Sequence, residues 1–193
     1  MGRWEPDARG RLSVAALDLY LERGYDQTTV ADIAERAGVT ERTFFRHFAD
    51  KREVLFDATN QLQNDVVSAV QSASAELSPM QVVELAMSEG PVFLEQRRAH
   101  ASRRAVALAA TPALMERELL KIYGLRTAVA VALEARGVDP LTARVAAETG
   151  GSCFSAGFAQ WVEAEDDRTL SSYIHEAFAQ LRLMTDVPHQ PRG

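Results

Sequence analysis

Two short helix signals that follow each other across one glycine constrain this fold more than any other part of the sequence. Residues 28–38 read TTVADIAERAG, and residues 39–48 read VTERTFFRHF. In the first segment Thr28 or Thr29 supplies an N-cap, apolar residues line one face, and a glycine ends the helix after about two turns. Thr40 caps a second helix of similar length. The spacing predicts a helix-turn-helix motif with Gly38 at the turn.

Helix signals continue along the rest of the chain. A first helix is predicted from about residue 7 to 23, and DKRE, Asp50–Glu53, has the spacing of a capping box that opens a fourth helix. Prolines that follow Ser78, Gly90, Thr111 and Asp139 each predict a further helix start. The last two long helices are predicted over about residues 140–162 and 168–184, the latter with an N-cap at Asp166 or Asp167. The final VPHQPRG is expected to be frayed.

These signals predict an all-α fold, because no longer segment shows the alternation of a β-strand. We expect an N-terminal three-helix helix-turn-helix domain over residues 1–55. A helical ligand-binding and dimerisation domain is expected over residues 56–193. The boundary falls near Phe56, and 47% hydrophobic residues in 193 are enough for a sizeable core.

The second helix of the motif and the residues after it carry a local basic character in an acidic chain. The net charge is −6, so non-specific coating of nucleic acid is not expected, but residues 40–52 hold four basic side chains and His47. A helix enters the major groove only if its outward positions donate hydrogen bonds or carry positive charge. The residues that meet this requirement are Thr40, Arg42, Thr43, Arg46 and His47. The alternative is an ordinary solvated face.

Three phenylalanines share this helix and have different expected places. Phe44 and Phe48 are assigned to the core, because a domain this small needs aromatic side chains to fill it. The pattern leaves Phe45 open between core and surface.

The stretch ERGYDQTTVADIAERAGVTERTFFRHFADKREVLF, Glu22–Phe56, resembles the tetracycline-repressor-like (TetR) family of regulators. The resemblance implies a dimeric repressor that binds a palindromic double-stranded operator and releases it when a small-molecule effector binds. Carried over by position, Thr29 and Lys51, at the starts of the second and fourth helices, hold phosphates. Arg42, Thr43, Phe45, Arg46 and His47 face the groove, although many members have tyrosine in place of Phe45.

Downstream, apolar residues between about 78 and 123 exceed the needs of one packed stripe, which predicts a cavity for a small apolar effector. Arginines and a histidine are expected at its polar end. The alternative is that these residues are core. The residues predicted to bind the ligand are Met87, Phe93, Arg97, His100, Met115, Tyr123, Phe154, Phe158 and Trp161.

The last two helices are predicted to form a homodimer interface. A stripe on the final helix faces a set of small residues on the helix before it, and two such pairs close a four-helix bundle. The alternative is an entirely intramolecular core. The interface residues are Thr149, Cys153, Gly157, Leu170, Tyr173, Ile174, Ala177, Phe178 and Leu181.

The rival classes are an enzyme built on a helical bundle and a helical adaptor without DNA binding. The four histidines stand apart without partners at helical metal-site spacing, so no metal is expected. GGSCFSAG, Gly150–Gly157, lacks the G-x-S-x-G pattern, and no cofactor or catalytic residue is predicted. EQRRAHASRR, Glu95–Arg104, is interpreted as a solvated face with ion pairs, with a second nucleic-acid surface as the alternative.

The composition also predicts the compartment. One cysteine, Cys153, excludes an intramolecular disulfide, and no apolar run approaches the roughly 20 residues of a membrane span. We expect a cytoplasmic protein that does not enter a membrane. The sequence therefore predicts a DNA-binding transcriptional regulator, not an enzyme.

Overall fold

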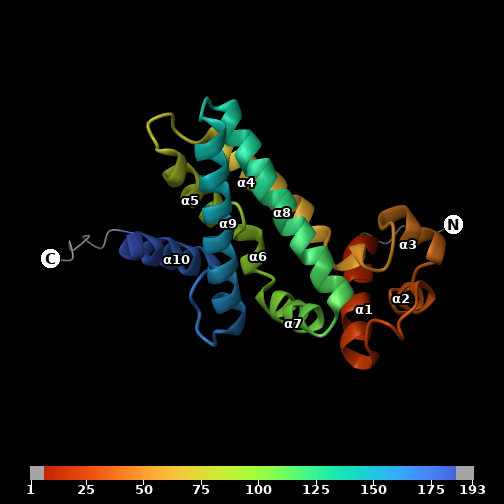
Figure 1. The fold of residues 1–193 in the computed structure, drawn as a ribbon. Coiled ribbons are helices and arrows are strands. Elements are labelled where there is room, and N and C mark those ends of the chain that lie inside the picture. Colours follow the sequence, from red (N-terminus) through yellow and green to blue (C-terminus); the bar gives the residue numbers. More distant parts are fainter. Residues whose placement is uncertain (1–6, 186–193) are drawn as a thin grey trace. The chain divides into compact units, whose positions relative to one another are not determined.

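The computed structural model describes residues 7–185, and the regular elements in that range are all helical, as predicted. Figure 1 shows their order along the chain. The elements are α1 (Ala8–Arg23), α2 (Val30–Arg36), α3 (Glu41–His47), the 3₁₀ turn η1 (Glu53–Leu55), α4 (Asp57–Ser72), α5 (Pro79–Glu89), α6 (Val92–Glu95), α7 (Arg98–Ala109), α8 (Pro112–Ala135), α9 (Pro140–Glu163) and α10 (Leu170–Thr185).

The chain divides into two compact units. The first contains the described residues up to Gln61 together with His100–Lys121, and the second contains Leu62–Ala99 with the described residues from Ile122 onward. The first unit therefore includes the segment predicted to be the helix-turn-helix domain and also parts of α7 and α8. No helix within residues 7–185 combines the length and the apolar character needed to cross a membrane.

Most helix starts follow the predicted caps. The hydroxyls of Thr29 and Thr40 accept hydrogen bonds from backbone N–H groups three residues on, and so do the side chains of Ser78 and Asp139. A proline follows Ser78 and Asp139 directly, in the first turn, where its missing N–H costs nothing. These side chains satisfy donors that have no partner inside the helix.

Two predicted helix starts are wrong. The Asp50 carboxylate accepts hydrogen bonds from the backbone N–H groups of Arg52 and Glu53, but they lead into η1, and α4 begins only at Asp57. Similarly, α10 begins at Leu170, where the Thr169 hydroxyl accepts a 3.2 Å hydrogen bond from the Ser172 N–H. A local capping pattern fixes a turn, and the following residues decide whether a helix continues from it. The C-terminal VPHQPRG lies outside the described residues.

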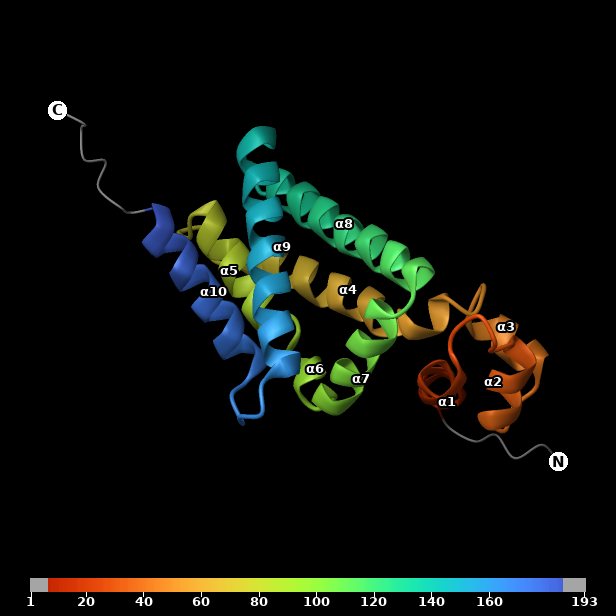
Figure 2. The same ribbon diagram turned by 60° about the horizontal axis from the view of Figure 1, so that its bottom comes forward.

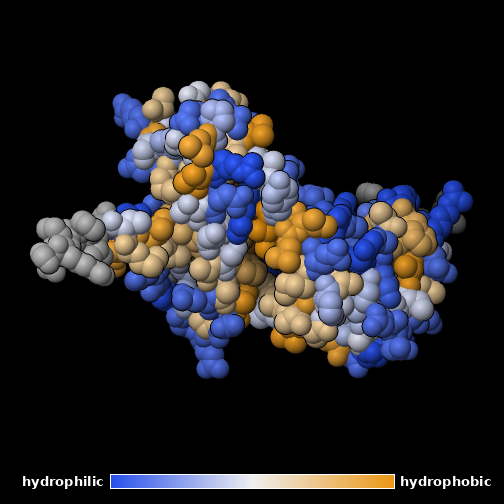
Figure 3. Space-filling model, viewed as in Figure 1, coloured by the Kyte–Doolittle hydropathy of each residue, from blue (hydrophilic) through white to orange (hydrophobic). Residues whose placement is uncertain are grey.

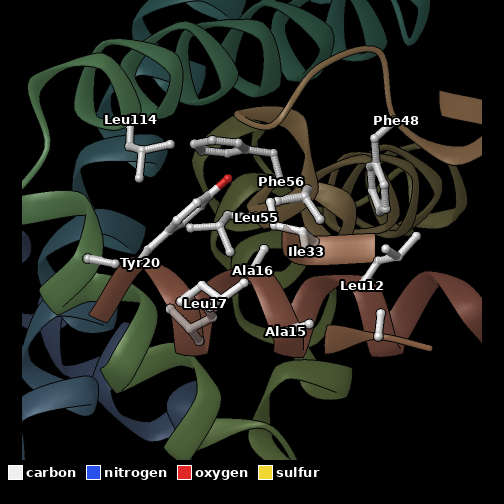
Figure 4. Packing of buried hydrophobic residues seen from close by; sticks show 14 of the residues in the cluster. Leu12, Ala15, Ala16, Leu17, Tyr20, Ile33, Phe48, Leu55, Phe56 and Leu114 are labelled. Atoms are coloured by element: carbon white, nitrogen blue, oxygen red, sulfur yellow. The ribbon is translucent and has the colours of Figure 1, made fainter. Parts of the chain in front are cut away.

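The core of the first unit is built on the apolar face of α1 (Figure 4). Ile33 from α2, Phe44 from α3 and Phe56 after η1 are each at most 1% exposed, and Phe48 is 4% exposed. The core assignment of Phe44 and Phe48 is confirmed. Leu108 and Leu114, from α7 and α8, complete this cluster, which explains why residues 100–121 belong to the same unit.

In the second unit α9 packs against both α10 and α5 (Figures 1 and 2). Glycines allow this close approach: a Cβ at Gly157 would lie 2.9 Å from the backbone of Ile174, and one at Gly150 would collide with Val83. The prediction that α9 presents small residues to a neighbouring helix is confirmed, and the neighbours belong to the same chain.

Six residues of the predicted dimer interface are buried within the protomer. They are Cys153, Gly157, Leu170, Tyr173, Ile174 and Phe178. Thr149, Ala177 and Leu181 are half-buried. The burial of the first six favours the alternative of an intramolecular core at those positions, and the dimer interface itself stays a prediction.

Candidate nucleic-acid interface

The two helices of the motif are joined as the sequence predicts. Gly38 has φ = 68°, a left-handed conformation that glycine adopts without strain. The Val39 N–H donates a 2.9 Å hydrogen bond to the carbonyl of Ala34, and Thr40 caps α3 through the Thr43 N–H at 3.2 Å. The turn is therefore closed by backbone hydrogen bonds, and α3 starts in a fixed direction.

The outward face of α3 carries Arg42, Phe45 and Arg46, all of which are exposed. Arg42 and Arg46 are four residues apart, which places them one above the other on the same face. Within residues 7–185 neither arginine pairs with a carboxylate, whereas the neighbouring Arg36 is bound at both nitrogens by Glu22. The two charges on α3 are therefore not neutralised within the described protein, and their donors face solvent.

Phe45 is 56% exposed and touches Phe44 edge-on, with ring centroids 5.4 Å apart. The ring therefore adds apolar area to a helix face that is otherwise polar. The question that the sequence left open is settled in favour of the surface. The ring lies between the two arginines in sequence and extends the same face.

Thr43 and His47 are half-buried and thus less available than the arginines. The hydroxyls of Thr40 and Thr43 are 3.1 Å apart and bond to each other. The Nε2 atom of His47 is buried without a hydrogen-bond partner, and its ring lies 6.4 Å from that of Phe48. His47 is thus held at the edge of the core.

The polar atoms of Thr29 form hydrogen bonds within the protein at the start of α2. Its hydroxyl and its backbone N–H both donate to the Asp32 carboxylate, at 2.5 and 2.8 Å, while the Asp32 N–H donates back to the hydroxyl. The Thr29 hydroxyl, with the Thr29 N–H and the Arg23 guanidinium, lowers the pKa of Asp32 to about 2. Residues 29–32 thus form a reciprocal capping box, and the role of Thr29 at a phosphate stays a prediction.

Lys51 has a different place from the one that the resemblance implies. It lies before η1 instead of at the start of α4. Its Nζ donates 2.9 Å hydrogen bonds to the carbonyls of Tyr25 and Thr28 and lies 4.2 Å from the centroid of the Tyr25 ring. An ammonium has three donors, so one N–H is left for an external group. Lys51 therefore joins the exit of α3 to the start of α2, a role that the sequence did not reveal.

The residues predicted to bind an effector are distributed over both units. His100 and Met115 belong to the first unit. In the second, Met87 and Trp161 are buried, Phe93 is half-buried, and Arg97 is exposed. Phe154, Phe158 and Trp161 form a row of ring contacts, with centroids 5.9 and 5.8 Å apart. These rings are part of the packed interior of their unit.

A groove of about 200 Å³ lies between α8 and α9 in the second unit. Of the predicted ligand residues, Tyr123 lines it. The others that line it were not predicted: Arg126, Thr127, Ala130, Val131, Glu134, Pro140, Arg144, Ala147 and Glu148. Arg126 donates a 3.2 Å hydrogen bond to Glu148, and its side chain crosses Gly151, where a Cβ would lie 2.4 Å from Nε. In the sequence, the two consecutive glycines at 150–151 are the feature that could have indicated this close approach of the Arg126 side chain to α9.

The geometry defines a class of protein: a helix-turn-helix protein whose second motif helix presents an exposed, basic face. Residues 12–58 match the family model described as "Bacterial regulatory proteins, tetR family". The helix-turn-helix segment of this chain is thus similar to that of the TetR family.

Named relatives agree with this assignment. The chain is 40% identical over 75 residues to the HTH-type transcriptional regulator TcmR of Streptomyces glaucescens, a match that covers 39% of this chain and 33% of TcmR. It is 43% identical over 47 residues to the HTH-type transcriptional repressor KstR2 of Mycobacterium tuberculosis, which covers 24% of each chain. The chain thus spans about a third or less of the length of these curated relatives.

Solved structures support the whole fold. A protein of Syntrophomonas wolfei assigned to the TetR-family transcriptional regulators has a TM-score of 0.63 at 17% identity, covering 95% of this chain and 97% of that one. The fatty acid degradation regulator FadR of Bacillus halodurans has a TM-score of 0.55 at 15% identity, covering 98% and 100%. Identities this low show a shared fold and leave the ligand open.

Proposed function

We propose that this protein is a cytoplasmic transcriptional regulator that binds double-stranded operator DNA through α3 and acts as a ligand-responsive repressor. One observation carries the proposal: Arg42 and Arg46 lie on one exposed face of the motif's second helix without a carboxylate partner within residues 7–185. Unpaired arginines on such a helix suit phosphate contacts and bidentate hydrogen bonds to guanine. The match of residues 12–58 to the family model supports the same function.

The contacts that we propose are divided by role. Arg42 and Arg46 read or position bases, Phe45 makes apolar contact in the groove, and Thr40, Thr43 and His47 add hydrogen bonds at its edge. Thr29 and Lys51 approach phosphates. Phosphate contacts set register and orientation, whereas base contacts set specificity.

Selection of bound DNA from a random duplex pool at a stated salt concentration tests this function. We expect a palindromic sequence, and replacement of Arg42 or Arg46 by alanine should cost about 1–3 kcal/mol of binding free energy and relax preference at one position in each half-site. Arg36→Ala is the matched control, because Arg36 is an exposed arginine on α2 that is already paired with Glu22. Absence of any selected sequence would favour the adaptor or the enzyme class.

We infer that the protein acts as a homodimer through exposed apolar residues of its last two helices. Leu141 and Val145 are 73% and 54% exposed on α9, and Leu183 and Met184 are 65% and 70% exposed at the end of α10. Figure 3 shows hydrophobic groups at the surface near the start of α9 and the end of α10. A palindromic operator requires two copies of α3, which a two-fold dimer supplies.

The effector is proposed to be a small molecule bound in the second unit. The groove between α8 and α9 offers apolar contacts from Ala130, Val131 and Ala147 and polar ones from Arg126 and Glu148. A mixed lining of this kind suits a mainly apolar molecule with a polar end. Titration of operator-bound protein with lipophilic cell extracts tests it, with release of DNA as the expected result and no release by any extract as the contrary one.

A further inference from the structure

A cluster of charged side chains in the first unit ties the segment after α3 to helices α7 and α8. We call it the clasp, and it consists of Glu53, Arg104, Arg117, Glu118 and Lys121. The segment Glu95–Arg104 has the sequence pattern of a solvated face, but the side chain of Arg104 is only 14% exposed. A charged group this shielded needs partners, and the partners show what the cluster holds.

Arg104 makes contacts in three directions. Its Nε donates a 2.8 Å hydrogen bond to the carbonyl oxygen of Leu55, the last residue of η1. Its terminal nitrogens donate to both oxygens of Glu118 on α8, at 2.6 and 3.3 Å. Its guanidinium also lies 4.8 Å from the centroid of the Phe56 ring. A planar guanidinium can satisfy all three at once, whereas a lysine ammonium cannot match the fork of a carboxylate.

Glu53 makes the second half of the clasp. Its carboxylate binds the side chain of Arg117 and lies 3.2 Å from Nζ of Lys121, both on α8. Burial raises the pKa of Glu53, but the side chains of Arg117 and Lys121 outweigh it, so the pKa is lowered overall and the carboxylate stays charged. Glu53–Phe56 are thus attached to α7 and α8 by two ion pairs, one hydrogen bond to a backbone carbonyl and one ring contact. A third ion pair, between Arg104 and Glu118, joins α7 to α8.

The clasp is better explained by its effect on the arrangement of the helices than by a contribution to the free energy of unfolding. The attraction within an ion pair shielded from water offsets little more than the cost of removing the two charges from water. Apolar residues of similar volume often stabilise a core at least equally. A fully hydrogen-bonded network of this kind does favour a single arrangement of the segments that it joins. The residues that it holds follow α3 by only five positions and come directly after Lys51 and Arg52, so the direction in which α3 ends depends on them.

We propose that Arg104 and Glu53 are positioning residues for DNA binding, which fix the end of α3 through η1. The inference rests on the proposed function.

The test compares Glu118→Gln with Glu116→Gln. Glu116 is exposed on the same helix, so the two variants change the net charge equally. Glu118→Gln should lower affinity for the selected duplex about tenfold, because the charged partner of Arg104 is lost. The dependence of affinity on salt should stay as in the wild type, since no phosphate contact is removed. Amide hydrogen exchange at Glu53–Phe56 should become faster, and Glu116→Gln should change none of these.

A second variant guards against general unfolding. Arg104→Lys keeps the charge but not the simultaneous hydrogen bonds, so we expect an intermediate loss of affinity with a native unfolding midpoint.

Three results would decide against the inference. Duplex affinity within twofold of wild type in Glu118→Gln, together with faster exchange, would show that the clasp is only structural. A smaller salt dependence would show a direct phosphate contact instead of positioning. Failure of the wild-type protein to bind any duplex would reject the proposed function itself, and this inference with it.

Discussion

The Nζ atom of Lys51 donates a 2.9 Å hydrogen bond to the carbonyl oxygen of Thr28, the residue that precedes the N-cap of α2. A second bond of equal length goes to the carbonyl of Tyr25, and the Tyr20 hydroxyl donates to the Lys51 carbonyl at 2.5 Å. The exit of α3 is thereby tied to α1 and to the start of α2. The angle between the two motif helices depends on this one side chain as well as on the core.

Lys51→Gln should therefore have two separate effects. Two carbonyls lose a charged donor, so the free energy of unfolding should fall by about 1–3 kcal/mol in denaturant titrations. The third N–H of the ammonium is proposed to meet a phosphate, so the slope of log affinity against log salt should become smaller by about 1 for each subunit. Arg52→Gln, an exposed change of equal charge, is the control. Unchanged stability would contradict the internal role, and an unchanged slope the external one.

Phe44 and Phe45 are adjacent and should respond in opposite ways to alanine. Phe44 is fully buried, so Phe44→Ala should lower the free energy of unfolding by about 3–5 kcal/mol. Phe45 is 56% exposed, so Phe45→Ala should change stability by no more than about 1 kcal/mol while it weakens duplex binding. Urea unfolding and duplex affinity, measured on both variants, separate the roles. A large stability loss in Phe45→Ala would place its ring in the core.

Asp32 should make stability depend on pH in the acid range. Its folded pKa is lowered to about 2, below the ordinary value of about 3.9 in an unfolded chain. A lowered folded pKa means that the stabilisation is complete above the unfolded pKa and is lost as pH falls through the folded one. The difference in unfolding midpoint between wild type and Asp32→Asn should be constant above about pH 5 and shrink towards pH 2. Glu35→Gln, which changes an exposed carboxylate of the same helix, is the matched control.

The local elements of the motif were predictable from the sequence because their signals are local. Thr29, Gly38 and Thr40 act on backbone groups within three residues, and those contacts exist in any chain that forms these helices. Asp50 shows the limit of such reasoning. Its side chain bonds to the predicted N–H groups, yet η1 and the buried Phe56 interrupt the helix, because core packing decides where α4 starts.

Long-range relationships were not predictable. Glu53 and Arg117 are 64 residues apart, and no pattern in either segment indicates the other. The stripe on α10 was visible, but amphipathic spacing is the same for a helix that packs on its own chain and for one that packs on a partner. Ile174 and Phe178 are buried within the protomer, which favours an intramolecular role for these two residues.

Val145 tests the proposed dimer interface. It is 54% exposed on α9, one turn beyond Leu141, so Val145→Glu should leave the protomer folded. A stable dimer interface usually buries at least about 1,000 Å², and a charge at its centre would remain unpaired there. We therefore expect sedimentation to show a dimer for wild type and a monomer for Val145→Glu at micromolar concentration. Val92→Glu, an equally exposed valine on α6, should remain dimeric. The affinity of Val145→Glu for the palindromic duplex should also be lower than that of wild type, because one protomer fills only one half-site. A wild-type protein that is monomeric and still binds the duplex with full affinity would exclude this interface.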